Sequence, residues 1–291
     1  MSNWPGLGIG TKNSDGDWIE MFFAEENISA EDLESSDAAF EKVSVSNDKA
    51  PTSLPEAYLK LHLLSYRFVK PNETNLDGIF GILQNVVWTS EGPFSIADFK
   101  KAQLEARREN RHILVHSVDK FPRMTDYVTL SDVRIADANR VRLGAYLGSG
   151  TTIMHEGFVN FNAGSLGEAM IEGRISQGVV IGDKTDIGGG ASTMGTLSGG
   201  NDIRISLGKN CLLGANSGLG IPLGDRCTVE AGLYLTASSK VEVIDDKGEI
   251  TETVKASELA SKSNLLFIRN SLTGSIQCRS NKKVIELNEE L

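Results

Sequence analysis

Long apolar runs are missing from this sequence of 291 residues. No stretch approaches the roughly 20 apolar residues needed to cross a bilayer, so we expect no membrane-spanning segment. The first residues, MSNWPGLGIGTKNSDGDW, contain no basic stretch followed by an apolar one, so we expect no secretory signal either. Both absences favour a cytoplasmic protein.

Cysteine and positive charge are also scarce. The three cysteines, Cys211, Cys227 and Cys278, lack the spacing of a metal site, which suits free thiols in a reducing cytoplasm. A formal net charge of −10 argues against non-specific nucleic-acid binding. An anionic ligand would therefore need a local basic pocket.

Residues 1–125 indicate a mixed α/β domain. Ser53 is a suitable N-cap for one helix, and Ser95 begins a second helix that ends near Asn110. The sequence HILVHSVD at 112–119 predicts a short buried strand. The histidines of this region are expected to be structural or surface residues rather than catalysts: His62, His112 and His116.

Aliphatic residues recur every six positions in the middle of the chain. The series is Ile135, Val141, Leu147, Ile153 and Val159; Ile175, Ile181, Ile187 and then Thr193; Leu207, Leu213 and Leu219; and Leu223, Val229, Leu235 and Val241. This period is neither helical nor alternating, but it is typical of a parallel β-helix with three short strands per coil. We therefore predict a mainly β protein in which residues 126–241 form a left-handed parallel β-helix, rather than an α/β fold with scattered Val-Gly pairs.

The period ends at about residue 242, and residues 242–291 are predicted to form a small C-terminal β cap. VEVIDDKGEITETV indicates a hairpin around residues 246–248, and NLLFIRNSLTGSIQCRS and KKVIELNEEL indicate short strands. The end of a stack of coils exposes core and unpaired backbone, so covering that end is the simplest role for this region.

Two breaks interrupt the rhythm, at 160–174 and at 195–202. A β-helix has flat faces and no natural cleft, so we expect function to lie in loops that leave the coil at these breaks, and in grooves between neighbouring prisms. Prisms of this kind associate side by side about a three-fold axis, which predicts a homotrimer with sites between its subunits.

Three long segments carry a family resemblance: GTTIMHEGFVNFNAGSLGEAMIEGRISQGVVIGDKTDIGGGASTMGTLSGG, KNCLLGANSGLGIPLGD and VEAGLYLTASSKV. They resemble the tetrahydrodipicolinate N-succinyltransferases, specifically the subgroup found in actinobacteria and some proteobacteria. The resemblance is strong over 131–241, persists in SNLLFIRNS and weakens over the first hundred residues. It implies succinyl transfer from succinyl-CoA to the amino group of L-2-amino-6-oxopimelate, on the diaminopimelate route to lysine, by a cytoplasmic homotrimer.

The resemblance also implies catalytic roles. The family's catalytic glutamate is that of the EGR motif, Glu172 here, and it acts either as a general base or as a nucleophile through a mixed anhydride. Arg174 would receive the succinyl carboxylate through its guanidinium fork. Gly195 is the candidate for a backbone N–H that stabilises the oxyanion.

The cofactor positions of the family extend along the coil into the cap. They correspond to Gly189, Ser192, Ala215, Glu230, Ala231, Ser238, Lys255, Ile268, Arg269, Asn270 and Ser271. At Ser238 the family more often has glycine. Lys255 and Arg269 supply cationic groups for the phosphates of CoA.

An ion on the three-fold axis is a further expectation from the resemblance. Glu156 of the HEG motif and an upstream acidic residue would hold Mg²⁺ or Ca²⁺ in a structural role. The upstream position here is Asn139, which removes three charges per trimer and weakens that site.

Other functions remain open on the sequence alone. Another CoA-dependent acyltransferase, using acetyl-CoA with His155 as base, would have the same architecture. A zinc hydratase of the γ-carbonic anhydrase type needs three imidazoles, whereas His155 is the one histidine of the repeat region. A non-catalytic trimeric scaffold would tolerate replacement of Glu172 and Arg174.

Overall fold

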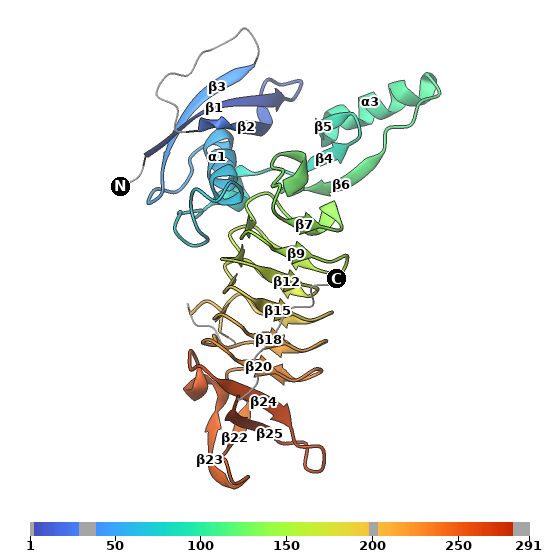
Figure 1. Ribbon diagram of the computed structural model, residues 1–291. Coiled ribbons are helices and arrows are strands. Elements are labelled where there is room, and N and C mark those ends of the chain that lie inside the picture. The colour runs from blue at the N-terminus through green and yellow to red at the C-terminus, as the bar shows by residue number, and fades with distance from the viewer. Residues whose placement is uncertain (1–2, 29–38, 198–202, 282–291) are drawn as a thin grey trace. The chain divides into compact units, whose positions relative to one another are not determined.

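The computed structural model describes residues 3–28, 39–197 and 203–281 (Figure 1). These residues form two compact units: 1–129 with 142–144, and 130–141 with 145–291. No helix in the described part of the chain is long and apolar enough to cross a membrane.

The first unit begins with an antiparallel sheet of order β2-β1-β3, and helix α1 packs on β2 and β3. Its elements are β1 (Asn3–Lys12), β2 (Trp18–Ile28), β3 (Phe40–Ser46) and α1 (Leu54–Ser65). Ser53 caps α1 as predicted, because its side chain accepts a hydrogen bond from the Glu56 N–H. The helix is buried along almost its whole length.

Two polar side chains of α1, those of Lys60 and His62, are buried and form hydrogen bonds within the first unit. Lys60 Nζ donates to the Ser46 carbonyl at 2.7 Å and to Thr74 Oγ1 at 3.0 Å. His62 Nδ1 donates to the Tyr58 carbonyl at 2.8 Å, while Nε2 accepts from the Phe23 N–H at 3.3 Å. Burial lowers the pKa of His62 to about 4, so the ring is neutral. His62 is therefore structural, as predicted.

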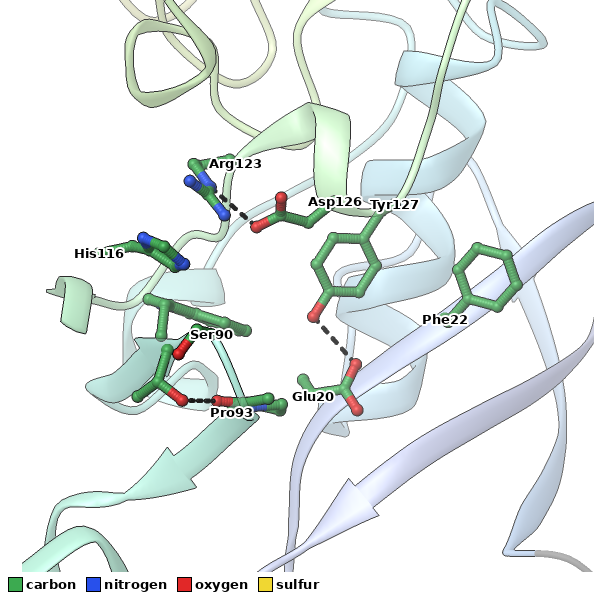
Figure 2. Close-up of a pocket in the computed structure, with 11 residues that line it drawn as sticks. Glu20, Phe22, Ser90, Pro93, His116, Arg123, Asp126 and Tyr127 are labelled. Atoms are coloured by element: carbon green, nitrogen blue, oxygen red, sulfur yellow. Dashed lines mark hydrogen bonds and ion pairs between the residues drawn. The ribbon is translucent and has the colours of Figure 1, made fainter. Parts of the chain in front are cut away.

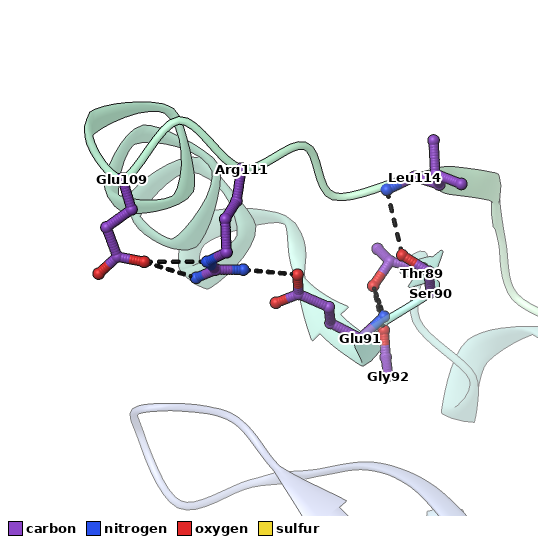
Figure 3. A network of polar contacts seen from close by, with 7 residues as sticks. All are labelled: Thr89, Ser90, Glu91, Gly92, Glu109, Arg111 and Leu114. Carbon is purple, nitrogen blue, oxygen red and sulfur yellow. Dashed lines mark hydrogen bonds and ion pairs between the residues drawn. The ribbon is translucent and has the colours of Figure 1, made fainter.

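A second antiparallel sheet, of order β5-β4-β6, completes the first unit. Its elements, with two helices, are α2 (Ile79–Ile82), β4 (Val86–Thr89), β5 (Gly92–Ser95), α3 (Ile96–Arg108) and β6 (Val115–Asp119). Ser95 caps α3 by accepting from the Asp98 N–H at 3.0 Å, as predicted. Beyond α3, Arg111 bonds both Glu109 at 2.9 Å and Glu91 at 2.6 Å, which ties this segment to the β4–β5 turn (Figure 3).

The prediction of a buried strand at 112–119 was wrong about burial. The strand β6 exists, but it lies at the edge of a three-stranded sheet, and Val115 and Val118 are 44% and 56% exposed. An edge strand has a neighbouring strand on one side only, so its apolar residues can remain exposed. His112 and His116 are also exposed, which confirms their predicted surface position.

The second unit is a parallel β-helix with three faces, whose successive rungs β7, β9, β12, β15, β18 and β20 are stacked in Figure 1. The first face contains β10 (Phe158–Val159), β13 (Arg174–Ile175), β16 (Ser192–Thr193), β19 (Gly218–Leu219) and β21 (Tyr234–Leu235). The second contains β8 (Tyr146–Leu147), β11 (Gly164–Ser165), β14 (Val180–Ile181) and β17 (Ser206–Leu207). The third contains β7 (Arg134–Ile135), β9 (Thr152–Ile153), β12 (Ala169–Ile171), β15 (Thr185–Ile187), β18 (Leu212–Leu213), β20 (Thr228–Val229) and β24 (Leu265–Arg269).

The predicted six-residue series forms the core of this coil. Each of its members from Val141 to Val241 is at most 3% exposed. Equivalent residues of successive coils pair in register, for example Val159 with Ile175 and Ile181 with Leu207. Burying a side chain of this size contributes roughly 1.5–3 kcal/mol, so the series is a main source of the stability of the unit.

The prediction that 160–174 leaves the coil was wrong. This segment forms β11 and β12, which pair with the neighbouring coils. The six-residue period is interrupted in the sequence for two reasons. Ser165 takes an inward position, where it bonds the Thr151 hydroxyl at 2.7 Å. The step from Ile171 to Ile175 is four residues rather than six. The break is a shortened corner.

The second break is a real excursion from the coil. Thr196 pairs with Arg204 in an antiparallel bridge, and the Leu197 N–H donates to the Ile203 carbonyl at 2.8 Å. Residues 198–202 lie outside the described part of the chain.

The C-terminal residues add an antiparallel hairpin and a further strand pair. β22 (Lys240–Ile244) pairs with β23 (Ile250–Lys255), which confirms the predicted hairpin, and β24 pairs with β25 (Ile276–Ser280). β24 also continues the third face, because Phe267 lies in register with Val229 of β20. The strand predicted in 282–291 lies outside the described residues.

Candidate active site

Two edges of the β-helix carry the two predicted catalytic residues, Glu172 and Gly195. The edge between the third and first faces, formed by 154–157, 172–173, 188–191, 214–217 and 230–233, is named the Glu172 edge. The edge between the first and second faces, formed in the described residues by 160–163, 176–179, 194–197, 203–205 and 220–222, is named the Gly195 edge.

Glu172 lies at the shortened corner between β12 and β13. The N–H groups of Glu172 and Gly173 both donate to the Ile187 carbonyl, at 2.8 and 3.1 Å. A Cβ at Gly173 would lie 2.4 Å from the Ala191 carbonyl oxygen, so only glycine fits this close stacking. The corner holds the Glu172 backbone in place, while the partly exposed side chain reaches toward Gly189 on the next coil.

Arg174 follows on the first face, where it is exposed. Its Nη2 donates to Ser192 Oγ at 2.6 Å, and the two residues are in register across β13 and β16. Among the described residues no ion pair joins Arg174 to Glu172. The structure therefore brings Arg174 and Ser192 together and leaves the Glu172 carboxylate unpaired by the guanidinium.

The predicted cofactor residues form a column along the Glu172 edge. The Asn216 N–H donates to the Gly189 carbonyl at 2.9 Å, and the Gly232 N–H donates to the Ala215 carbonyl at 2.8 Å, so successive coils stack corner on corner. The Arg269 N–H continues the column into the cap by donating to Glu230 Oε2 at 2.7 Å. Glu172, Gly189, Ala215, Glu230, Ala231 and Arg269 thus follow one line.

Gly195 lies on the Gly195 edge instead, and Ser238 lies between β21 and β22. A Cβ at Gly195 would lie 3.3 Å from the Gln177 carbonyl, and the Gly195 N–H has no hydrogen-bond partner among the described residues. One chain therefore does not bring Gly195 and Glu172 to the same edge.

The remaining cofactor residues belong to the cap. Lys255 is exposed at the start of a short 3₁₀ helix, Ala256–Leu259, and Ile268 lies on β24. Asn270 and Ser271 lie in the β24–β25 turn, where Asn270 Oδ1 accepts from the Leu272 N–H at 2.9 Å.

The residues predicted for an axial ion are already engaged within the chain. Arg140 Nη2 lies 3.5 Å from Glu156 Oε2, and Asn139 Nδ2 donates to Asp137 Oδ1 at 3.1 Å. These contacts are within one chain, whereas the predicted ion would take its ligands from three subunits. The described residues also contain no group of three His, Cys, Asp or Glu side chains that could hold a metal.

His155 and Asp186 are further titratable residues near Glu172. His155 is exposed on the Glu172 edge, one coil before Glu172. Asp186, on β15, was not predicted from sequence: burial and the charge of Glu172 raise its pKa to about 6. No sequence signal marks Asp186, because an outward acid within a hexapeptide normally faces solvent.

The structure contains two hollows that no residue of the Glu172 edge lines. One of about 440 Å³ belongs to the first unit, where Tyr127 donates to Glu20 at 2.9 Å and Arg123 pairs with Asp126 at 2.9 Å (Figure 2); none of the predicted site residues line it. The other, of about 620 Å³, lies in the cap and is lined by Asn270 together with Lys247 and Arg279, among others.

A prism of hexapeptide coils with an acidic corner and a line of small residues defines a hexapeptide-repeat acyltransferase. Family models match in three places: "Tetrahydrodipicolinate N-succinyltransferase N-terminal" at 12–81, "Tetrahydrodipicolinate N-succinyltransferase middle" at 83–123, and "Hexapeptide repeat of succinyl-transferase" at 204–237. The chain belongs to the tetrahydrodipicolinate N-succinyltransferase family.

Relatives of known sequence and structure agree with this. The chain is 59% identical to the 2,3,4,5-tetrahydropyridine-2,6-dicarboxylate N-succinyltransferase of Vibrio cholerae over 249 residues, covering 86% of this chain and 73% of the relative. It is 48% identical to that of Pseudomonas putida, covering 98% and 96%. A crystal structure of a 2,3,4,5-tetrahydropyridine-2-carboxylate N-succinyltransferase from Campylobacter jejuni superposes with a TM-score of 0.87 at 30% identity, covering 97% and 93%.

Proposed function

We propose that the Glu172 edge carries the succinyl transfer of this tetrahydrodipicolinate N-succinyltransferase. The enzyme acts in the diaminopimelate route to lysine, with succinyl-CoA as co-substrate and L-2-amino-6-oxopimelate as the acceptor. The observation that supports this site is the single line from Glu172 through Gly189 and Ala215 to Glu230 and Arg269, because an extended thioester needs an extended surface beside the catalytic group.

The chemical step needs an unprotonated amine and a polarised thioester. The acceptor nitrogen attacks the thioester carbonyl, the C–S bond breaks, and the amine proton passes to Glu172 and then to the leaving thiolate. In the alternative, Glu172 attacks the thioester first, and the amine then resolves a mixed anhydride. In both mechanisms the Glu172 carboxylate must be free to accept a proton or to attack, and among the described residues no ion pair with Arg174 engages it, since Arg174 bonds Ser192.

Arg174 is assigned to the carboxylate of the succinyl group. Ser192 holds one of its Nη groups, so the guanidinium is oriented along the first face while other N–H groups remain to bind a ligand. Gly195 is assigned to the oxyanion through its N–H, which has no partner among the described residues. Since Gly195 lies on the other edge, this role places the site between two subunits of a homotrimer.

The far end of CoA is assigned to the cap. Lys255 and Arg269 are exposed and cationic, and the neighbouring hollow adds Lys247 and Arg279. Ala231, Ile268, Asn270 and Ser271 are assigned to the same path, whereas Ser238 lies between β21 and β22 and would meet the cofactor from there.

Three further assignments concern a metal ion, the subgroup of the family and the cellular compartment. An ion on the three-fold axis would take Glu156 as ligand in competition with Arg140, which lies 3.5 Å from it, and no step is assigned to a metal. The HEG and EGR motifs favour the actinobacterial-type subgroup, although the relatives above come from Vibrio and Pseudomonas. Three buried free cysteines suit the cytoplasm.

The test is thiol release from succinyl-CoA, with and without L-2-amino-6-oxopimelate, by wild type and Glu172→Gln. We expect release that requires the amine and falls at least about 100-fold in the variant, the usual scale for a lost proton acceptor. Glu168→Gln is the matched control, because Glu168 is an exposed glutamate at another corner of the same coil.

Each other result has a distinct meaning. Amine-dependent release that survives Glu172→Gln would refute the role of Glu172 and direct attention to His155. Transfer from acetyl-CoA at the rate seen with succinyl-CoA would favour the second candidate, a hexapeptide acyltransferase of another acyl group.

A further inference from the structure

Asp186 lies on the outer side of β15, beside Met170 of β12 and Leu212 of β18. Its Oδ1 atom is out of contact with solvent and has no hydrogen-bond partner. Neither neighbouring strand presents a charged side chain to it, since Met170 and Leu212 are both apolar. An oxygen of an ionisable carboxyl is thus buried without any compensating group, which is an unfavourable arrangement in a purely structural position.

Glu172 is the charged neighbour of Asp186. The register pairs Ile187 with Ile171, and the Ile187 carbonyl accepts hydrogen bonds from the N–H groups of Glu172 and Gly173. Asp186 is thus adjacent to the residue that anchors the catalytic corner. Burial, followed by the charge of Glu172, raises the pKa of Asp186 to about 6. The nearby cation Arg174 is turned to Ser192 and does not pair with Asp186 in the described structure.

We propose that Asp186 is a positioning carboxylate of the acyl-transfer site, acting through Glu172 by making it a better proton acceptor. This proposal rests on the assignment of Glu172 as the group that takes the amine proton. When Glu172 accepts that proton, its repulsion with Asp186 is relieved, so the ionised Asp186 favours the proton transfer. When the leaving thiolate takes the proton, the two carboxylates return to their starting state.

The pH dependence follows from the direction of this coupling. Above about pH 6 Asp186 is ionised and assists Glu172. As the pH falls through that value Asp186 is protonated, the assistance is lost, and kcat/KM declines. Asp186→Asn resembles the protonated form at every pH, so its acid limb should lie at lower pH.

The experiment compares the pH profiles of kcat and KM for wild type, Asp186→Asn and Asp183→Asn. Asp183 is a matched control on the same coil, because its Oδ1 accepts a hydrogen bond from the Glu168 N–H at 2.9 Å and has a structural role. For Asp186→Asn we expect kcat at pH 8 to fall about 10-fold, because an interaction between the two carboxylates of about one pKa unit corresponds to a factor of ten. The KM for succinyl-CoA should not change. Its melting temperature should equal or exceed that of wild type.

An acid limb that stays in place in Asp186→Asn would overturn the proposal. So would a lower melting temperature with an unchanged profile, because that is the result of a structural role. Asp183→Asn should show the opposite pattern, with reduced stability and a wild-type profile.

A second measurement separates this proposal from the assignment of the reaction. Infrared difference spectra of the protonated carboxyl band, recorded against pH for wild type minus Asp186→Asn, isolate the titration of Asp186. We expect its midpoint to fall in Glu172→Gln, because the repelling charge is gone. An unchanged midpoint overturns the coupling even if succinyl transfer is confirmed. A shifted midpoint in an enzyme that releases no thiol would instead show that the coupling is real and the reaction wrongly assigned.

Discussion

Asp186 and Glu172 are acidic side chains on the outside of the same coil, but they differ in their surroundings. Both are partly exposed, but Glu172 is at a corner, whereas Asp186 lies between two apolar neighbours and has one carboxylate oxygen buried. Raising the pKa of Asp186 from 3.8 to about 6 makes the folded state bind a proton more tightly than the unfolded chain. The resulting destabilisation develops between these two values and is complete above pH 6.

This destabilisation explains why the Asp186→Asn protein should be no less stable than wild type at neutral pH. The full shift corresponds to about 3 kcal/mol, and partial exposure of the side chain reduces the expected gain to about 1 kcal/mol. Side chains that lower the stability of the folded state are typical of functional sites, because there a residue is retained for the reaction although it destabilises the fold.

Arg174 provides a second test of a single side chain. Arg174→Lys keeps the charge but loses the planar fork, so we expect KM for succinyl-CoA to rise about 10-fold, which is about 1.4 kcal/mol, with little change in kcat. Steady-state kinetics with succinyl-CoA and acetyl-CoA measure this. Acetyl-CoA lacks the carboxylate, so its KM should not change.

Ser192→Ala is the graded control for that prediction. It removes the 2.6 Å contact that orients Arg174 but leaves the guanidinium in place, so its effect should be smaller than that of Arg174→Lys. Equal KM increases for the two acyl donors would contradict the assignment of Arg174.

The corners of the coil repeat as regularly as its strands. On the edge between the second and third faces, Lys184, Asn210, Arg226 and Asn264 all adopt positive φ, between 54° and 61°. Asparagine at such positions is expected from sequence, because it tolerates the left-handed region well. Lysine and arginine are not expected at such positions from sequence. The positive φ is imposed by the stacking of the coils and is not a preference of these residues.

Gly164 tests how closely these coils stack. It adopts a φ of 144°, and a Cβ at this position would lie 1.8 Å from the Tyr146 carbonyl oxygen. Gly164→Ala should therefore separate β8 from β11 and destabilise the second unit by at least about 3 kcal/mol. Thermal unfolding followed by circular dichroism measures the loss.

Gly232→Ala is its control within the same β-helix. Gly232 also has a positive φ, 72°, but a Cβ there meets nothing within 4 Å, so only backbone strain of about 1 kcal/mol is expected. Equal losses in the two variants would show that the φ angle, and not the stacking, limits these positions.

The sequence predicted the regular part of the architecture and missed its exceptions for definable reasons. The six-residue period was sufficient for the β-helix, because each inward position needs an apolar side chain. Ser165 was missed because its hydroxyl is satisfied by Thr151, a partner 14 positions earlier. Asp186 was missed because its neighbours Met170 and Leu212 become neighbours only when the coils stack.

The site as a whole depends on which residues share an edge. The resemblance named Glu172 and the cofactor positions, and the stacking places Glu172, Gly189, Ala215, Glu230 and Ala231 on one edge. It places Gly195 on another edge, so one chain cannot present Glu172 and the Gly195 N–H to the same thioester. In the proposed trimer the Glu172 edge of one subunit would lie beside the Gly195 edge of its neighbour, so that the site is completed by symmetry and not by any single chain.

Mixed trimers test this arrangement directly. Glu172→Gln and Gly195→Val should each abolish activity, the second because a branched side chain blocks the approach to the N–H. If the variants are unfolded together and refolded as a 1:1 mixture, about one quarter of the interfaces should pair an intact Glu172 with an intact Gly195. Thiol release should therefore recover to about one quarter of the wild-type rate, with sedimentation confirming trimers in each sample. A mixture that stays inactive, although both variants refold to trimers, would mean that each site draws both residues from one chain, because no exchange of subunits would then restore a complete site.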